Sequence, residues 1–356
     1  MTTIRETLPE AHRRLFPAVY DRPNVEERRA TCSDCAMCSR SEAPGTIAFQ
    51  PNLKCCTYHP TLPNFLAGAV LADPDMAEGQ RRMRARIASR IGITPQWVAP
   101  PRKHRVLLDA ARTTSFGRSK VLLCPYFVEE GGGLCSIWRH REAVCSTFFC
   151  KHDAGAAGHA FWTAHKRFTA HVEVVLARHA ARAVFPGAAE PDFPRMKLTL
   201  EDLEDRAPSE IDYAACWGEW AGREEDFYLR TFDVVRSVTR DEMDRLLAEE
   251  PRSEELARDV ATKLDAITAP RLAERLVPNP NLVARPLPGG AMGVTTYSAY
   301  DPMSLTPELW AVLGEFKPEE TLAETRARLD RDNDLVIADD LLLVLQNHAI
   351  LVPPPA

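Results

Sequence analysis

Nine of the ten cysteines of this 356-residue chain lie between residues 32 and 150, and this clustering constrains the fold more than any other feature. A chain of this length can bury a sizeable apolar core, so it does not need disulfides to staple a small fold. The N-terminus shows no apolar signal segment, and no apolar run approaches the ~20 residues of a membrane span. We therefore expect a cytoplasmic protein without membrane contact, in which clustered cysteines indicate metal binding or catalysis.

The first cysteines follow a C-x2-C-x2-C pattern, formed by Cys32, Cys35 and Cys38. Two-residue gaps let one loop place several thiolates around a metal, and this run opens the bacterial-type ferredoxin pattern, which a remote cysteine completes. A single C-x2-C pair would also suit zinc. Three cysteines in step favour an iron–sulfur cluster, with zinc as the alternative.

The remaining clustered cysteines fall into two further groups. Cys55 and Cys56 are adjacent, so their side chains diverge: either one binds metal while the other packs, or they serve two sites. Four more thiols lie within 27 residues, which is enough for a tetrahedral zinc site or a 4Fe-4S cluster. The candidate metal ligands are thus Cys32, Cys35, Cys38, Cys55, Cys56, Cys124, Cys135, Cys145 and Cys150.

Cysteine is also among the most buried residue types, and the isolated Cys216 is expected to pack in a core. His59, His140 and His152 lie near cysteines and could replace a thiolate, but we expect them beside the site or on the surface. The glycines 131–133 lack the pattern of a phosphate loop and predict a tight turn before Cys135.

Charge is unevenly distributed along the chain. Residues 1–158 hold 22 Lys and Arg against 15 Asp and Glu, whereas the rest holds 22 against 35. A basic stretch at 81–90 could contact phosphates, but it has no interleaved aromatic residues and is more typical of a solvated helix face. Residues 281–356 hold 5 basic and 11 acidic residues, which disfavours binding of nucleic acid there.

The predicted fold class is α+β, in three consecutive domains. Residues 1–158 should form an irregular, metal-centred, cysteine-rich domain, and 159–270 a helical region that packs on it. Long helices are expected at 159–185 and 253–268, with an exposed connection at 186–210. Residues 280–356 should form a small winged-helix-like module of short strands and three helices, one of them capped by Thr306 with Pro307 at its first position.

Residues 32–150 resemble the YkgJ-type cysteine-cluster proteins, a family described as zinc- or iron-chelating. The likeness rests on the cysteines above and on the segment Cys135-Ser136-Ile137-Trp138-Arg139-His140-Arg141-Glu142-Ala143-Val144-Cys145. The family usually has proline where Glu142 stands, and C-x3-C-x2-C-C where this chain has two-residue gaps and a separate cysteine pair. The resemblance implies metal binding and does not specify a reaction.

Residues 282–352 are similar to the PqqD-like peptide-binding modules of peptide-modification pathways. The matching features are the stretch 285–290, the helix with Leu309 and Trp310, and the run 339–345 before a closing strand. This resemblance implies that a peptide adds a strand to the edge of the module's sheet.

Two functional hypotheses follow. In the first, the protein binds an iron–sulfur cluster and carries redox chemistry or a modification reaction on a peptide. In the second, it is a zinc-stabilised, non-enzymatic scaffold that binds a peptide or protein partner through its C-terminal module. The sequence contains no H-E-x-x-H, G-x-S-x-G or radical-SAM motif and names no catalytic base, so both hypotheses stay open.

Overall fold

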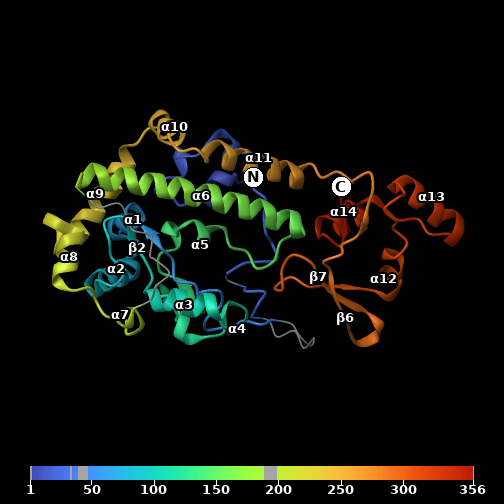
Figure 1. Ribbon diagram of the computed structural model, residues 1–356, viewed down its shortest axis with the longest axis horizontal. Coiled ribbons are helices and arrows are strands. Elements are labelled where there is room, and N and C mark those ends of the chain that lie inside the picture. Colours follow the sequence, from blue (N-terminus) through green and yellow to red (C-terminus); the bar gives the residue numbers. More distant parts are fainter. Residues whose placement is uncertain (1, 33, 39–46, 188–198, 356) are drawn as a thin grey trace. The chain divides into compact units, whose positions relative to one another are not determined.

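The computed structural model describes residues 2–32, 34–38, 47–187 and 199–355 (Figure 1). The connection expected at 186–210 falls partly outside these residues. The chain divides into two compact units, each built from several segments. Unit 1 comprises residues 1–24, 49–148 and 166–256, and unit 2 comprises 25–48, 149–165 and 257–356. No helix in the described part of the chain is both long and apolar enough to cross a membrane.

Unit 1 is mainly helical, with short 3-10 turns near its N-terminus and two small antiparallel strand pairs, β1 with β2 and β3 with β4. Its strands are β1 (Leu62–Pro63), β2 (Trp97–Val98), β3 (Phe127–Val128) and β4 (Leu134–Cys135). Its helices are α1 (Asn64–Ala72), α2 (Ala77–Ser89), α3 (Arg102–Ala110), α4 (Arg112–Ser115), α5 (Ala143–Thr147), α7 (Leu200–Leu203), α8 (Glu210–Trp217), α9 (Glu224–Ser237) and α10 (Arg240–Ala248).

Helix α1 forms the centre of unit 1 and packs closely on α9 (Figure 1). Its residues 64–71 are all buried, as expected for a helix that is apolar on every side. A methyl group on Gly68 would lie 2.0 Å from the Tyr228 carbonyl oxygen, so the absence of a side chain at Gly68 permits this close crossing. The Asn64 side chain, buried in the same core, donates to the carbonyl oxygens of Pro95 and Ala177.

Two long helices contribute to both units because the boundary falls within them. Helix α6 spans Gly155–Val184 and α11 spans Ser253–Thr268. They confirm the helix predicted from periodicity at 159–185 and the helix predicted between two prolines at 253–268. Helix α10 begins after Thr239, whose hydroxyl caps the helix by accepting from the Glu242 backbone N–H.

The C-terminal part of unit 2 contains two small antiparallel sheets and three helices. One sheet has the order β6-β7-β8, and the other pairs β5 with β9. The strands are β5 (Val277–Pro278), β6 (Val283–Pro286), β7 (Met292–Thr295), β8 (Met303–Leu305) and β9 (Leu351–Val352). The helices are α12 (Pro307–Leu313), α13 (Leu322–Asn333) and α14 (Asp339–Asn347).

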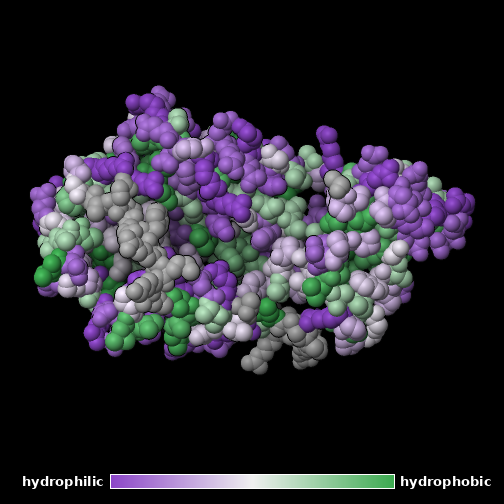
Figure 2. All heavy atoms as spheres, viewed as in Figure 1, coloured by the Kyte–Doolittle hydropathy of each residue, from purple (hydrophilic) through white to green (hydrophobic). Residues whose placement is uncertain are grey.

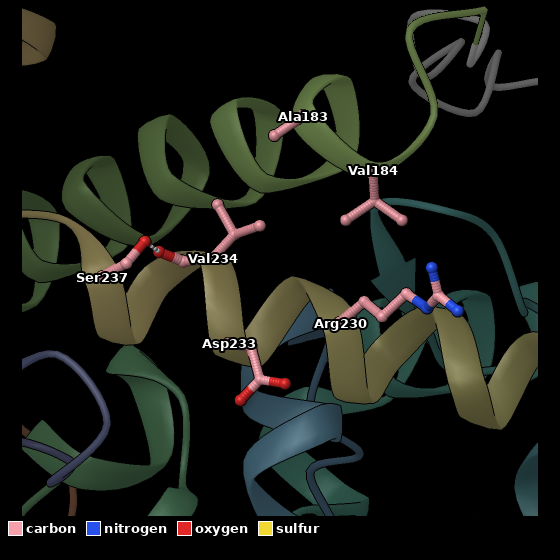
Figure 3. Close-up of a pocket in the computed structure, with 6 residues that line it drawn as sticks. All are labelled: Ala183, Val184, Arg230, Asp233, Val234 and Ser237. Atoms are coloured by element: carbon pink, nitrogen blue, oxygen red, sulfur yellow. Dashed lines mark hydrogen bonds between the residues drawn. The ribbon is translucent and has the colours of Figure 1, made fainter.

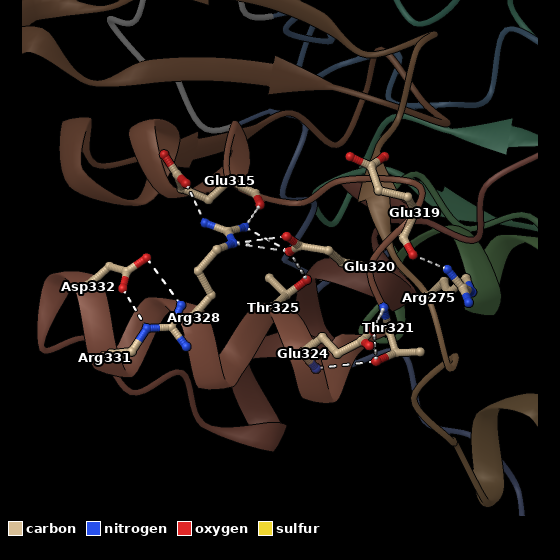
Figure 4. Close-up of polar contacts among 10 residues, drawn as sticks. All are labelled: Arg275, Glu315, Glu319, Glu320, Thr321, Glu324, Thr325, Arg328, Arg331 and Asp332. Atoms are coloured by element: carbon tan, nitrogen blue, oxygen red, sulfur yellow. Dashed lines mark hydrogen bonds and ion pairs between the residues drawn. The ribbon is translucent and has the colours of Figure 1, made fainter.

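Apolar residues from these sheets and helices form one core, which includes Val294, Leu313, Leu329, Leu342 and Ile350. The helix starts follow the predicted signals: Thr306 caps α12 with Pro307 at its first position. At the surface, the Arg328 guanidinium bonds to the carboxylates of Glu315 and Glu320 (Figure 4).

The mixture of helices and strands confirms the α+β class. The winged-helix-like description and the three domain boundaries are not tested by the grouping into two units, and they stay predictions.

Candidate metal centre

Five cysteines of unit 1 approach one another around the β3–β4 hairpin, and we call them the unit-1 thiol group: Cys55, Cys56, Cys124, Cys135 and Cys145. The hairpin itself pairs Phe127 with Cys135. Gly131, Gly132 and Gly133 make its turn with φ angles of 72°, 86° and 82°, which glycine adopts without strain. The predicted tight turn before Cys135 is therefore confirmed.

The segment that carries Cys55 and Cys56 is tied to the hairpin on both sides. The Cys124 backbone N–H donates to the Cys56 carbonyl oxygen at 2.8 Å. The buried Lys54 ammonium donates to the Gly133 carbonyl oxygen at 3.1 Å. These bonds connect residues about 70 to 80 positions apart in the chain and hold the Cys55–Cys56 pair beside Cys124.

Cys145 enters the thiol group on the short helix α5. The Glu142 carboxylate caps this helix by accepting from the backbone N–H groups of Val144 at 2.5 Å and Cys145 at 3.0 Å. The Cys145 thiol also hydrogen bonds to Glu142. Glu142 thus orients both the helix and its cysteine.

The thiols influence one another electrostatically. Burial raises the pKa of the Cys124 thiol, and Cys135 and Cys55 raise it further. A hydrogen bond with Cys56 and then burial raise the pKa of Cys55. Burial, followed by the charges of Glu142, Cys124 and Cys135, raises the pKa of Cys145. Several thiolates in this group would therefore repel one another unless a cation compensated their charge.

Two arginines supply positive charge at the thiol group. Arg82 donates to the Pro125 carbonyl oxygen at 2.6 Å and lowers the pKa of Cys124. Arg141 donates to the Cys145 carbonyl oxygen at 3.1 Å, stacks 3.4 Å over the Trp138 ring and lowers the pKa of Cys55. Their backbone bonds fix both guanidinium groups near the sulfurs.

The donor set fits a thiophilic metal, because cysteine sulfur is the common protein ligand of zinc and of iron–sulfur clusters. As they stand, however, the described residues contain no group of three or more His, Cys, Asp or Glu side chains arranged to hold a metal ion. Binding would thus require the thiols to turn toward a common centre.

The other four predicted ligands belong to unit 2 and are described separately. Cys32 is exposed, whereas Cys35, Cys38 and Cys150 are half-buried. The Cys38 backbone N–H donates to the Cys35 carbonyl oxygen at 2.9 Å, which curls the end of the C-x2-C-x2-C loop into a turn. Cys216 lies half-buried on α8, next to the fully buried Trp217.

The three histidines near cysteines are all buried, which excludes surface placement for them. His59 packs against His104 and Tyr126, with ring centroids 5.4 and 6.3 Å away. His140 bonds through Nε2 to the Asp73 carboxylate at 3.0 Å. Burial lowers the pKa of His152 to about 4, so this ring is neutral at physiological pH.

Sequence reasoning missed a buried polar group in unit 1. His12 is fully buried, and its Nε2 lies 3.7 Å from the Glu173 carboxylate, which accepts from the Ala143 backbone N–H. Burial lowers the pKa of His12 to about 3, and burial with the charge of Glu142 raises that of Glu173 well above its usual value. The sequence feature that could have indicated this buried pair is Glu173, a glutamate on the apolar face of α6.

Other surface features offer less chemistry. A hollow between α6 and α9 is lined by Ala183, Val184, Arg230, Asp233, Val234 and Ser237 (Figure 3). It presents one carboxylate, which pairs with Arg236. On α2, Arg81 and Arg82 pair with Glu78, and Arg84 pairs with Glu225. The surface over α13 is largely hydrophilic (Figure 2).

No known family model, curated protein or solved structure matches this chain.

Proposed function

We propose that this protein binds metal through its clustered cysteines, with a 4Fe-4S iron–sulfur cluster as the favoured group and zinc as the alternative. The observation that carries the proposal is the unit-1 thiol group, in which three separate stretches of chain bring five cysteines to one hairpin. Nine cysteines within residues 32–150 are far more than a core needs for packing. The resemblance to YkgJ-type proteins agrees with this proposal.

Cys124, Cys135 and Cys145, with one of the adjacent Cys55 and Cys56, are the thiols that would hold the metal in unit 1. A bound iron–sulfur cluster supplies one-electron transfer, and a zinc ion supplies structural cross-linking. The chain's own contribution is to bury the sulfurs and to offset their negative charge with Arg82 and Arg141. Glu142 holds Cys145 in place.

The test is a set of single substitutions in the protein purified without oxygen. Cys124→Ala and Cys135→Ala should each lower bound metal per chain at least twofold, because each removes a thiolate from a four-ligand site. Cys216→Ala is the matched control and should keep the metal content of the unaltered protein. Equal metal in all three variants would contradict the proposal.

The two metals are distinguished by colour and composition. An iron–sulfur cluster gives a brown protein with broad visible absorbance and acid-labile sulfide, whereas zinc gives a colourless protein with whole-number zinc per chain. The second outcome would favour the zinc-stabilised scaffold.

A second function is favoured by the edge of the three-stranded sheet. Among the described residues β6 pairs only with β7, and Val283 on β6 is 68% exposed. We propose that an extended peptide pairs with β6, since an open strand edge offers main-chain hydrogen bonds to a partner. Peptides selected from a random display library should slow amide exchange in β6, and Val283→Lys should weaken them. Unchanged exchange in β6 with bound peptide would exclude this edge.

A further inference from the structure

An exposed apolar surface of unit 1 lies over three elements: helix α3, helix α7 and the 3-10 turn Lys120–Leu122, with α3 in contact with both of the others. Hydrophobic residues gather over α3 and α7 in Figure 2. Single exposed apolar residues are ordinary, but a group of them on adjoining elements marks an interaction surface. We call this group the α3–α7 patch, and its members are 38 to 77% exposed: Val106, Leu107, Val121, Leu200 and Leu203.

Helix α7 turns its polar side toward the protein and its apolar side toward solvent. The Asp202 carboxylate of α7 accepts from the Arg102 guanidinium of α3 at 2.5 Å. Leu200 and Leu203 are instead 61% and 46% exposed, and no residue of α7 is buried. A surface helix normally places its apolar residues against the core of its own chain. The reversed orientation of α7 therefore indicates that a second surface covers its leucines.

The 3-10 turn carries the most exposed residue of the patch, Val121, which is 77% exposed. This turn is held against α3, because His104 Nε2 lies 3.2 Å from the Leu122 carbonyl oxygen and the Leu122 side chain is buried. Val121 thus projects from a backbone that α3 holds in place.

The two sides of the patch carry opposite charge. On the α7 side, residues 200–205 include four acidic residues and no basic one. On the α3 side, residues 102–105 include three basic residues and no acidic one. The sides attract each other where they meet, since the Lys103 ammonium lies 3.6 Å from the Asp205 carboxylate.

Further charges on both sides face solvent. Arg105 and Lys120 are exposed on the α3 side, and Glu201 is exposed on the α7 side. A two-fold rotation places the acidic side of one copy opposite the basic side of a second copy. The α3–α7 patch is therefore complementary to itself in charge as well as in apolar character.

We propose that the α3–α7 patch is the interface of a two-fold symmetric dimer of this chain. In this dimer the leucines of α7 in one copy cover the aliphatic residues of α3 and of the 3-10 turn in the other, and Lys120 of one copy lies opposite Glu201 of the other. A membrane with anionic lipids fits the patch less well, because it would repel the acidic residues of α7. The inference is independent of metal binding.

Sedimentation of the full protein over a range of concentrations tests the dimer. The unaltered protein should pass from the mass of one chain to that of two as its concentration rises. Val121→Asp should weaken the dimer at least about tenfold, because it places a charge within the apolar interface. Ile211→Asp is the matched control, since it introduces the same charge at an 81% exposed residue on α8 of the same unit, and it should dimerise normally. A protein that is monomeric throughout, or equal weakening by both changes, would overturn the proposal.

Charge reversal tests the two-fold arrangement. Lys120→Glu should weaken the dimer several-fold, because the new carboxylate faces Glu201 of the second copy. Adding Glu201→Lys to the same chain should restore the dimer, since both contacts regain opposite charges. A double variant that dimerises no better than Lys120→Glu alone would contradict this pairing of the two sides.

Hydrogen exchange in the unaltered protein covers the case in which a variant does not fold. Amide exchange in α3 and α7 should slow as the protein concentration rises, while exchange in α8 stays the same. Slowing in other elements with none in α3 and α7 would place the dimer interface elsewhere and overturn the proposal. Slowing of α3 and α7 in a monomeric protein on phosphatidylserine vesicles would also overturn it, because the occupant would then be a membrane.

Discussion

Buried carboxylates are the individual residues with the clearest consequences in this protein. Glu27 is the clearest case. Burial raises the pKa of its carboxyl from 4.5 to about 7, although the hydrogen bonds that it accepts from the Asp153 and Trp162 N–H groups lower this pKa. The charge of Asp153 raises this pKa further and that of Arg29 lowers it. Glu27 therefore changes charge near neutral pH, within the network that joins residues 27–29 to residues 152–153.

This shift predicts a pH-dependent stability. Below about pH 4.5 Glu27 is protonated in both folded and unfolded chains, so its contribution to the free energy of unfolding is fully present. As pH rises toward 7 the unfolded chain ionises first, and stability falls by up to about 3 kcal/mol. Glu27→Gln should therefore reduce the loss of stability between pH 5 and pH 8. Denaturant unfolding at both pH values measures this, and parallel pH profiles for the two proteins would contradict it.

At the scale of elements, the β3–β4 hairpin is the part on which the unit-1 thiol group depends. Gly132 and Gly133 both have positive φ angles, so alanine is strained at either position. Only at Gly133 would the new methyl group collide with a side chain, at 2.7 Å from the Phe127 ring, whereas Gly132 has open space. Phe127 pairs directly with Cys135, so this collision should displace the thiol.

We predict that Gly133→Ala lowers stability by about 1–3 kcal/mol more than Gly132→Ala, and that it alone lowers metal content. Thermal unfolding and metal analysis of the two variants check this. Equal losses of stability in the two variants would mean that backbone strain, and not the contact with Phe127, determines the stability of the hairpin.

Elements with local signals were predictable from the sequence. Three helices have signals that lie within one or two helical turns of sequence. These are the periodic apolar residues of α6, the prolines around α11 and the Thr306-Pro307 start of α12. Helix α1 was not predicted, because a helix buried on every side has no polar face and hence no period. The candidate cysteines were found from spacing alone, since thiols are rarely clustered by chance.

Contacts between distant residues could not be predicted. Arg29 and Asp301 are separated by 272 positions, and no local pattern indicates that they bond. The same holds for His12 with Glu173. The division of the nine cysteines between two units likewise depends on how the chain returns on itself, so spacing indicated metal binding without showing which thiols belong together.

At the scale of the whole molecule, the account requires that unit 2 has a core of its own. Leu342 lies in that core with no exposed surface, while its neighbour Leu341 on α14 is 38% exposed. Leu342→Ala should destabilise unit 2 by about 2–5 kcal/mol, because it leaves a cavity, and Leu341→Ala should cost well under 1 kcal/mol. Hydrogen exchange should quicken in α12, α13 and α14 of Leu342→Ala and stay slow in α1 and α9. Equal quickening throughout would show that the two units unfold as one.

The most direct test of the central claim is a measurement of iron, acid-labile sulfide and zinc per chain in the full protein purified without oxygen, together with its visible spectrum. The account predicts a coloured protein with iron and sulfide in equal amounts, about four of each per chain for one 4Fe-4S cluster. A colourless protein with about one zinc ion per chain would support the same thiol site with the alternative metal. A protein with no bound metal, in which all nine clustered cysteines react at once with an alkylating reagent, would contradict the account.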